Sequence, residues 1–187
     1  MKMKLKKFKS VKSTNDVAHE LIRKNITSPT LIFSEKQTKG RGTMGKKWIS
    51  LKGNIFLSIL LLIDSKKINF KQYALLNAYL IRKILSKYLL NRISIKWPND
   101  LLIEKKKVCG ILQEFIQYKN KEFLIVGVGI NTYASPSIKN LKTTSIQDFA
   151  KKKVDNNKVL KDIKKTYEKF IKDTKMFKFL DLKKKYK

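Results

Sequence analysis

Apolar residues recur along the chain with two different spacings, which predicts strands interleaved with helices. Runs that are continuously apolar, or that alternate with polar residues, predict strands over 4–9, 30–33, 54–63, 93–97, 107–118 and 121–130. Helical spacing predicts helices from Ser13 onward and over 69–90, 145–151, 157–173 and 177–187. The mixed order of these elements favours an α+β fold, in which helices cover one face of a mixed β-sheet.

Several of these elements begin or end at residues with suitable chemistry. Ser13, Thr14 and Asn15 carry hydroxyl or amide groups that can cap the free N–H groups at the start of the first helix. The segment 119–121 is a short polar connection that fits a hairpin between the last two strands. The most regular helical face is formed by Tyr73, Leu76, Leu80, Ile84 and Tyr88.

Length and composition limit the class of protein. The 187 residues contain no repeat and no long linker, so we expect one domain over 1–187. The longest apolar run, 55–63, is too short to cross a bilayer, and the basic N-terminus lacks the apolar stretch of a signal peptide. The single cysteine, Cys109, excludes an internal disulfide and fits a reducing compartment. These features predict a cytoplasmic protein without a membrane partner.

The formal net charge is +30, from 44 Lys and Arg residues against 14 Asp and Glu residues. Only four of the cations are arginine, the residue preferred for bidentate contacts with phosphate and guanine. The lysines are spread along the whole chain rather than gathered in one patch. A solvated lysine surface is therefore favoured and no specific nucleic-acid partner is expected, although a lysine-rich nucleic-acid-binding module stays open as an alternative. That alternative predicts a steep salt dependence of binding.

A glycine-rich loop is the first of three segments that could perform chemistry. It reads Gly40-Arg41-Gly42-Thr43-Met44-Gly45, in which the glycines permit close approach of backbone to a phosphate and Arg41 supplies a planar charged fork. The spacing matches the dinucleotide-binding fingerprint, but the following residues lead into a strand rather than the helix which that fingerprint requires.

The second segment is Lys96-Trp97-Pro98-Asn99-Asp100, where Pro98 ends a strand and leaves Asn99 and Asp100 at its edge. Lys107 begins the next strand, and Gly110 within it indicates close approach by a ligand or another backbone. The third segment is Gly127-Val128-Gly129-Ile130-Asn131, whose glycines expose backbone near a strand end. We expect the three segments to line one cleft.

The remaining polar residues give little support for a catalytic triad or a structural metal site. His19 is the only histidine and is expected on the surface of the first helix, so a serine or cysteine triad is not favoured. Lys107 belongs to the run 105–107, which by itself would read as a solvated turn. No Cys/His cluster suggests a structural metal site, so no metal ligands are expected from the protein.

The order and spacing of these segments resemble the catalytic core of the biotin protein ligase family, from about residue 8 to residue 150. The resemblance implies the catalytic-domain fold of biotin and lipoate protein ligases. It also implies residues for biotin, with Ser13, Thr14 and Gln37 at its ureido ring. The implied biotin-binding residues are Ser13, Thr14, Asn15, Gln37, Gly40, Arg41, Gly42, Trp48, Lys107, Gly110, Ile111 and Leu112.

The resemblance further implies ATP as a substrate with Mg²⁺. The implied ATP- or adenylate-binding residues are Arg41, Gly42, Thr43, Lys96, Asn99, Lys107 and Asn131. The resemblance implies that biotin is first activated to biotinyl-5′-AMP and then transferred to a lysine of the biotin carboxyl carrier protein of acetyl-CoA carboxylase. Arg41 and Lys107 would neutralise the meeting anions, and Asp100 would orient the acceptor amine or accept its proton.

Two departures from the family pattern affect these expectations. The second arginine usual in the glycine loop is Thr43 here, which predicts weaker retention of the adenylate. We also expect neither an N-terminal DNA-binding domain nor a C-terminal SH3-like domain, and a monomer or a homodimer. A lipoate ligase or lipoyl transferase and a biotin-binding relative without activity remain as rivals.

Overall fold

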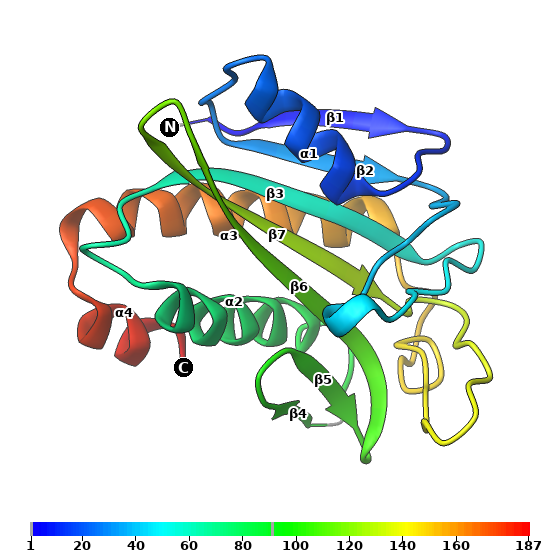
Figure 1. Ribbon diagram of the computed structural model, residues 1–187. Helices are drawn as coiled ribbons and strands as arrows, with labels where there is room; N and C mark the ends of the chain where they lie inside the picture. The colour runs from blue at the N-terminus through cyan, green and yellow to red at the C-terminus, as the bar shows by residue number, and fades with distance from the viewer. Residues whose placement is uncertain (1, 91) are drawn as a thin grey trace.

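The computed structural model describes residues 2–90 and 92–187, and these residues form one seven-stranded mixed sheet (Figure 1). The strands lie in the order β1-β2-β3-β7-β6-β5-β4, with β1 and β2 parallel and every other neighbouring pair antiparallel. Their bounds are Lys4–Phe8 for β1, Thr30–Ser34 for β2, Ile55–Ile63 for β3, Ile93–Lys96 for β4, Asp100–Ile103 for β5, Lys106–Tyr118 for β6 and Lys121–Ile130 for β7.

Three helices pack on one face of this sheet and share its larger hydrophobic core. They are α2 (Phe70–Leu85), α3 (Asn156–Met176) and α4 (Phe179–Tyr186). Because successive side chains of a strand point to opposite faces, Leu31 and Ile59 enter this core, whereas Ile32 and Leu60 enter a smaller one on the other face. The predicted α+β class with a mixed sheet is confirmed.

The smaller core is covered by α1 (Thr14–Arg23), which lies on the face opposite to α3 (Figure 1). The expectation of helices on one face thus holds for α2, α3 and α4, and α1 adds a helix on the second face. Along β7, Phe123 and Ile125 pack against α1, and the next positions on the same face are Gly127 and Gly129. One end of this face of β7 is therefore covered by α1, and the other end carries only glycines.

Most predicted elements are confirmed, with adjusted ends. Ser13 caps α1 by accepting from the N–H of Asn15, and Asn69 and Gln72 form a capping box at the start of α2. The helix predicted over 69–90 ends at Leu85, so Tyr88 lies beyond it. The 119–121 connection joins β6 to β7 as expected, with Lys119 and Asn120 at positive φ.

One predicted element is wrong, and one strand is missing from the prediction. Residues 145–151 form turns instead of a helix, because Thr144, Ser145 and Asp148 bond one another locally. Such side-chain bonds compete with helix formation. The strand predicted over 93–97 ends before Pro98 as expected, whereas the short strand β5, which begins at Asp100 and pairs with β4 and β6, is not predicted. In the described part of the chain, no helix is long and apolar enough to span a membrane.

Candidate active site

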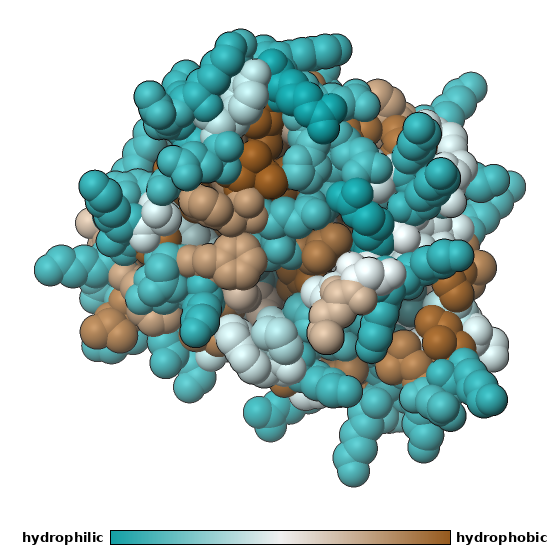
Figure 2. Space-filling model, in the orientation of Figure 1, coloured by the Kyte–Doolittle hydropathy of each residue, from teal (hydrophilic) through white to brown (hydrophobic). Residues whose placement is uncertain are grey.

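A cavity of about 520 Å³ lies on the α1 side of the sheet, where β6 and β7 carry glycines. Its walls come from the glycine loop, from β6 and β7, and from the segment 136–143. Figure 2, drawn in the orientation of Figure 1, shows hydrophilic side chains projecting around the rim of the molecule and apolar atoms gathered toward the middle of this face. A mainly apolar trough bordered by polar groups suits a small organic ligand.

Trp48 forms the floor of this trough by lying across β6 and β7. A Cβ atom on Gly110 would be 2.6 Å from Trp48 Cζ3, and one on Gly129 would be 2.3 Å from Trp48 Cε2. Gly110 and Gly129 are paired across the two strands, so together they make a flat seat for the indole ring. Gly110 does permit a close approach, as the sequence indicates, but the group that approaches is a tryptophan side chain.

Lys107 and Asp100 form an ion pair at the cavity, with 2.7 Å between Lys107 Nζ and Asp100 Oδ1. The ammonium group also lies 5.4 Å from the centre of a Trp48 ring. A β-bulge places Lys107 here: Leu101 pairs with Cys109, but Leu102 pairs with Lys107, which leaves Val108 as an extra residue in β6. The bulge lets Lys107 share the cavity face with Gly110, while Cys109 enters the large core.

The glycine loop is itself a small hairpin. Gly42 N–H donates to the carbonyl of Lys46, and Trp48 N–H donates to the carbonyl of Gly40. A short 3₁₀ turn over Thr43–Gly45 forms its tip. As the sequence predicts, the loop opens no α-helix, but residues 46–50 form only an isolated bridge at Lys47, and the next strand, β3, begins at Ile55.

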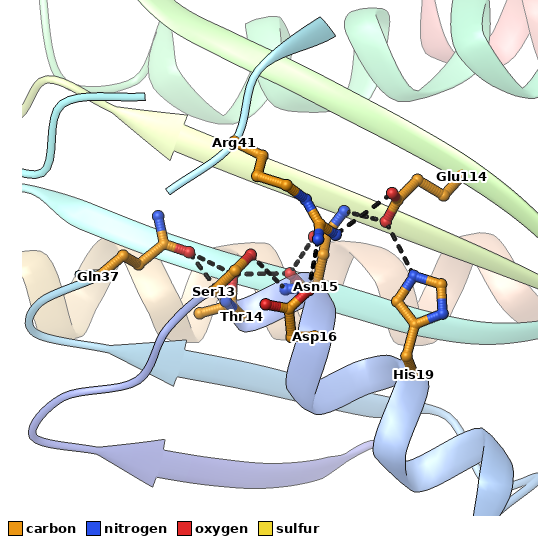
Figure 3. Close-up of polar contacts among 9 residues, drawn as sticks. Ser13, Thr14, Asn15, Asp16, His19, Gln37, Arg41 and Glu114 are labelled. Atoms are coloured by element: carbon orange, nitrogen blue, oxygen red, sulfur yellow. Dashed lines mark hydrogen bonds and ion pairs between the residues drawn. The ribbon is translucent and has the colours of Figure 1, made fainter. Parts of the chain in front are cut away.

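Beneath the other end of the cavity lies a chain of buried polar groups (Figure 3). Gln37 Oε1 accepts from the N–H and the hydroxyl of Thr14, at 2.8 and 3.1 Å. Ser58 Oγ lies 2.7 Å from Thr14 Oγ1 and also contacts Asn15 Oδ1. Asn15 Nδ2 donates to Glu114 Oε2 at 2.6 Å. This chain connects Gln37 at the cavity wall with Glu114 in the middle of β6.

Glu114 is the most heavily contacted carboxylate near the cavity. The hydrogen bond from His19, followed by that from Asn15 and the charge of Arg41, holds the pKa of Glu114 below its ordinary value despite partial burial. His19 Nε2 lies 3.3 Å from Glu114 Oε2, and Arg41 Nη2 lies 3.4 Å from Glu114 Oε1. Arg41 Nη1 is also 2.6 Å from Asp16 Oδ1. The expected surface position of His19 holds only in part, since its side chain is 24% exposed and faces Glu114.

Most of the residues expected to bind ligands line the cavity. These are Gln37, Arg41, Gly42, Thr43, Trp48, Asn99, Lys107, Gly110, Ile111, Leu112 and Asn131. Ser13, Thr14 and Asn15 are buried in the helix cap and the polar chain behind Gln37 rather than in the wall. Gly40 is outside the lining and packs against the backbone of Trp48. Asp100 is outside it too but contacts the lining residue Lys107. Lys96 is exposed and does not line the cavity.

Several residues near the site are not identified by the sequence patterns. The wall also includes Lys46, Lys47, Ile49, Pro136, Ile138, Leu141 and Thr143. The segment 136–143 has no regular pattern, and it reaches the site because Lys107 N–H donates to the carbonyl of Lys142. Glu114 lies on the same strand face as Gly110 and Leu112, and that alternation is the one signal that could have singled it out.

Protein ligands for a metal ion are not gathered anywhere in the described residues, which contain no cluster of three or more His, Cys, Asp or Glu side chains. Asn131 contributes a different kind of group. Its Oδ1 is buried without a hydrogen-bond partner within the described structure, while its Nδ2 donates to the carbonyl of Thr144. An orphaned oxygen of this kind can accept a donor from a ligand or coordinate a hard cation that a ligand brings.

Comparisons with known proteins agree with this geometry. The sequence profile of the "Biotin/lipoate A/B protein ligase family" matches residues 7–131. The chain is 34% identical over 168 residues to the "Bifunctional ligase/repressor BirA" of Bacillus subtilis, covering 86% of this chain and 51% of the relative. It is 28% identical over 127 residues to the "Biotin--[acetyl-CoA-carboxylase] ligase" of Paracoccus denitrificans, covering 66% of this chain and 52% of the relative.

Solved structures show the same fold. The biotin protein ligase of Aquifex aeolicus, solved with biotin and ATP, superposes with a TM-score of 0.80 at 31% identity. The match covers 98% of this chain and 76% of that chain. The chain thus spans about half the length of the curated relatives it matches.

Proposed function

Because the chain belongs to the biotin/lipoate A/B protein ligase family, we propose that it is a biotin protein ligase, which forms biotinyl-5′-AMP from biotin and ATP and transfers biotin to a lysine of an acceptor protein. One observation carries this proposal. A single cavity joins a polar end at Gln37, an apolar floor at Trp48 and a cationic end at Lys107. That sequence of environments fits a polar ureido ring, an aliphatic chain and a carboxylate.

The polar end would hold the ureido ring through Gln37 and the groups behind it. Gln37 Oε1 is already fixed by Thr14, so its Nε2 is the group left to turn toward a ligand; it lies 3.4 Å from Ser50 Oγ. Trp48, Gly110, Ile111 and Leu112 would enclose the apolar part of biotin. Burial of hydrocarbon against such walls contributes about 25 cal/mol per Å².

The cationic end would bring two anions together. The biotin carboxylate attacks the α-phosphorus of ATP and pyrophosphate leaves, so the repulsion between the carboxylate and the triphosphate must be offset. Lys107, which is paired with Asp100, lines the cavity, and Lys46, Lys47 and Arg41 line it as well. Mg²⁺ would enter bound to the phosphates of its substrate ATP, near the orphaned oxygen of Asn131.

In the second step a neutral lysine amine of the acceptor attacks the acyl carbon and AMP leaves. Asp100 is the carboxylate next to Lys107, and we assign it two tasks. It holds Lys107 in place during activation, and it orients the attacking amine or accepts its proton during transfer. Asn99 and Thr43, whose side chains lie 3.5 Å apart, would border the nucleotide.

The acceptor we propose is the biotin carboxyl carrier protein of acetyl-CoA carboxylase, and the compartment we propose is the cytoplasm. A relative named for the acetyl-CoA carboxylase substrate supports the choice of acceptor. The net charge of +30 would speed the encounter with an acidic carrier domain. The free thiol of Cys109, buried in the core, suits a reducing compartment.

The test is incubation of the intact chain with ATP, Mg²⁺, biotin and a carrier domain, read as a mass gain of one biotinyl group on the acceptor lysine. A competent ligase of another species, run in parallel, shows that the carrier accepts biotin. Absence of the gain with a competent carrier overturns the proposal. Replacing biotin with lipoate in the same assay tests the lipoate-ligase alternative, for which we expect no transfer.

A further inference from the structure

The side chain of Arg41 reaches away from the loop that carries it and ends between two carboxylates (Figure 3). Asp16 belongs to the first turn of α1, and Glu114 lies in the middle of β6. The two terminal nitrogens of Arg41 are divided between them, with Nη1 2.6 Å from Asp16 and Nη2 3.4 Å from Glu114. We call this arrangement the Arg41 clasp.

Glu114 is held in position independently of Arg41, and the backbone of Asp16 is placed by α1. Glu114 accepts from Asn15 Nδ2, contacts His19 and has a lowered pKa, so it is charged at neutral pH. Its side chain is 25% exposed, which strengthens its attraction to a cation relative to a fully solvated pair. Asp16 follows the cap residue Ser13 in α1, where a negative charge is favoured by the helix dipole.

The clasp fixes one strand of the loop hairpin, and Trp48 fixes the other. Arg41 pairs with Lys47 as an isolated bridge, and Trp48 is seated on Gly110 and Gly129. The hairpin, whose residues 41–43 and 46–48 line the cavity, thus has an anchor on each of its strands. In the part of the chain that the structure describes, the hairpin is otherwise held by the Trp48 anchor, by the contact of its tip with Asn99 and by backbone bonds just before it, at Thr38 and Lys39.

We propose that Asp16 and Glu114 are positioning residues, which hold the glycine loop closed over the cavity through Arg41 and so retain the reactive adenylate. The inference rests on the proposed function for the identity of the retained ligand. An arginine has five N–H donors, so two ion pairs leave donors for a phosphate oxygen. Closing the loop and binding the adenylate are therefore compatible roles for Arg41. The clasp would thereby offset part of the weaker adenylate retention that is expected from Thr43.

The first experiment needs no ligand and measures how often the loop opens. The full chain and the double variant Asp16→Asn/Glu114→Gln are digested briefly with trypsin, and cleavage after Lys39, Arg41, Lys46 and Lys47 is followed by mass spectrometry. Loss of two partly exposed ion pairs should accelerate these cuts about threefold to tenfold. Glu122→Gln, which removes a carboxylate bonded to Ser65 far from the loop, serves as the matched control and should cut like the parent.

The second experiment measures retention. Preformed biotinyl-AMP is bound to each protein and its release is followed after dilution into an excess of unlabelled ligand. The double variant should release it about threefold to tenfold faster, whereas Asp16→Glu, which keeps the charge, should stay near the parent rate. If the carboxylates had a merely structural role, the double variant would have a lower melting temperature but would not release biotinyl-AMP faster than Asp16→Glu. Thermal unfolding is therefore recorded for every variant.

The outcomes separate the clasp from the proposed function. Equal trypsin rates in the loop for parent and double variant overturn the clasp. Unchanged or slower release of biotinyl-AMP overturns its role in retention, and slower release would mean that the carboxylates compete with the ligand for Arg41. If the parent protein neither makes nor binds biotinyl-AMP, the proposed function fails, and the trypsin comparison still decides whether the clasp holds the loop.

Discussion

Lys107 Nζ lies 2.7 Å from Asp100 Oδ1, which links the first residue of β5 to its neighbour β6 beside the β-bulge in their pairing. Both side chains are 18% exposed, so the pair sits at the boundary between cavity and solvent. Removal of either partner changes the charge presented to the ligands. The two partners should nevertheless affect different steps of the reaction.

Asp100→Asn should slow transfer from preformed biotinyl-AMP about 100-fold, because a general base or orienting carboxylate is lost. Formation of biotinyl-AMP should fall only about tenfold, since Lys107 keeps its charge but loses its partner. Single-turnover measurements of the two steps check this split. Asp181→Asn, on the exposed surface of α4, is the control for loss of an acid. Transfer at the parent rate would remove Asp100 from the second step.

Lys107→Met should reduce formation of biotinyl-AMP about 100-fold or more, because the ammonium group paired with Asp100, which offsets the meeting anions most directly, is then lost. The neighbouring Lys106→Met is the matched control, since Lys106 is exposed and does not line the cavity. Pyrophosphate release measured for both variants checks the prediction. Equal losses in the two variants would show that general lysine charge, and not the position of Lys107, is what matters.

Gly129→Ala should displace the indole of Trp48, since the added Cβ would lie 2.3 Å from Cε2. We expect about tenfold weaker biotin binding, equivalent to ~1.4 kcal/mol, and a stability loss of about 1 to 3 kcal/mol from overpacking. Calorimetric titration with biotin and denaturant unfolding measure both. In the double variant Gly129→Ala/Trp48→Leu the stability loss should shrink because the clash is gone. If the double variant lost as much stability as Gly129→Ala alone, a clash with Trp48 would be contradicted.

Thr43→Arg should slow the release of biotinyl-AMP about tenfold, because a guanidinium group at the cavity wall can bond a phosphate oxygen. Met44→Arg adds the same charge one residue further on, where the side chain is 95% exposed, and should change release little. Biotinylation of bystander proteins should fall in parallel with release in the Thr43 variant. Equal effects of the two substitutions would indicate a general charge effect on the loop.

Glu114 should make the free energy of unfolding depend on pH in one direction. Its pKa in the folded protein lies below the ordinary value of 4.5, so its stabilisation is fully present above about that pH and is lost as the pH falls through the folded value. Glu114→Gln should cost about 1 kcal/mol at pH 7, and progressively less below pH 4.5. Urea unfolding of both proteins across this range checks the sign. A difference that grows on acidification would contradict it.

Local sequence patterns determined most of the strands and helices and pointed to many of the residues that line the cavity. The apolar runs in 54–63 and 121–130 and the caps at Ser13 and Asn69 depend on neighbours in the chain, so the sequence carries them directly. The same holds for the glycines at 110, 127 and 129, which mark where something must approach the sheet. Spacing alone could not say what approaches.

Only the tertiary structure decided the partners, because each contact joins residues far apart in sequence. It placed Trp48 on Gly110 and Gly129, Asn15 against Gly127, and Arg41 on Glu114, 73 positions away. It also used a bulge at Val108 to bring Lys107 from a lysine run into the cavity, which no pattern within 105–107 reveals. Periodicity determines on which face of its element each side chain lies. The register between strands and the path of the loops determine which faces meet, and thus which charges lie near a ligand.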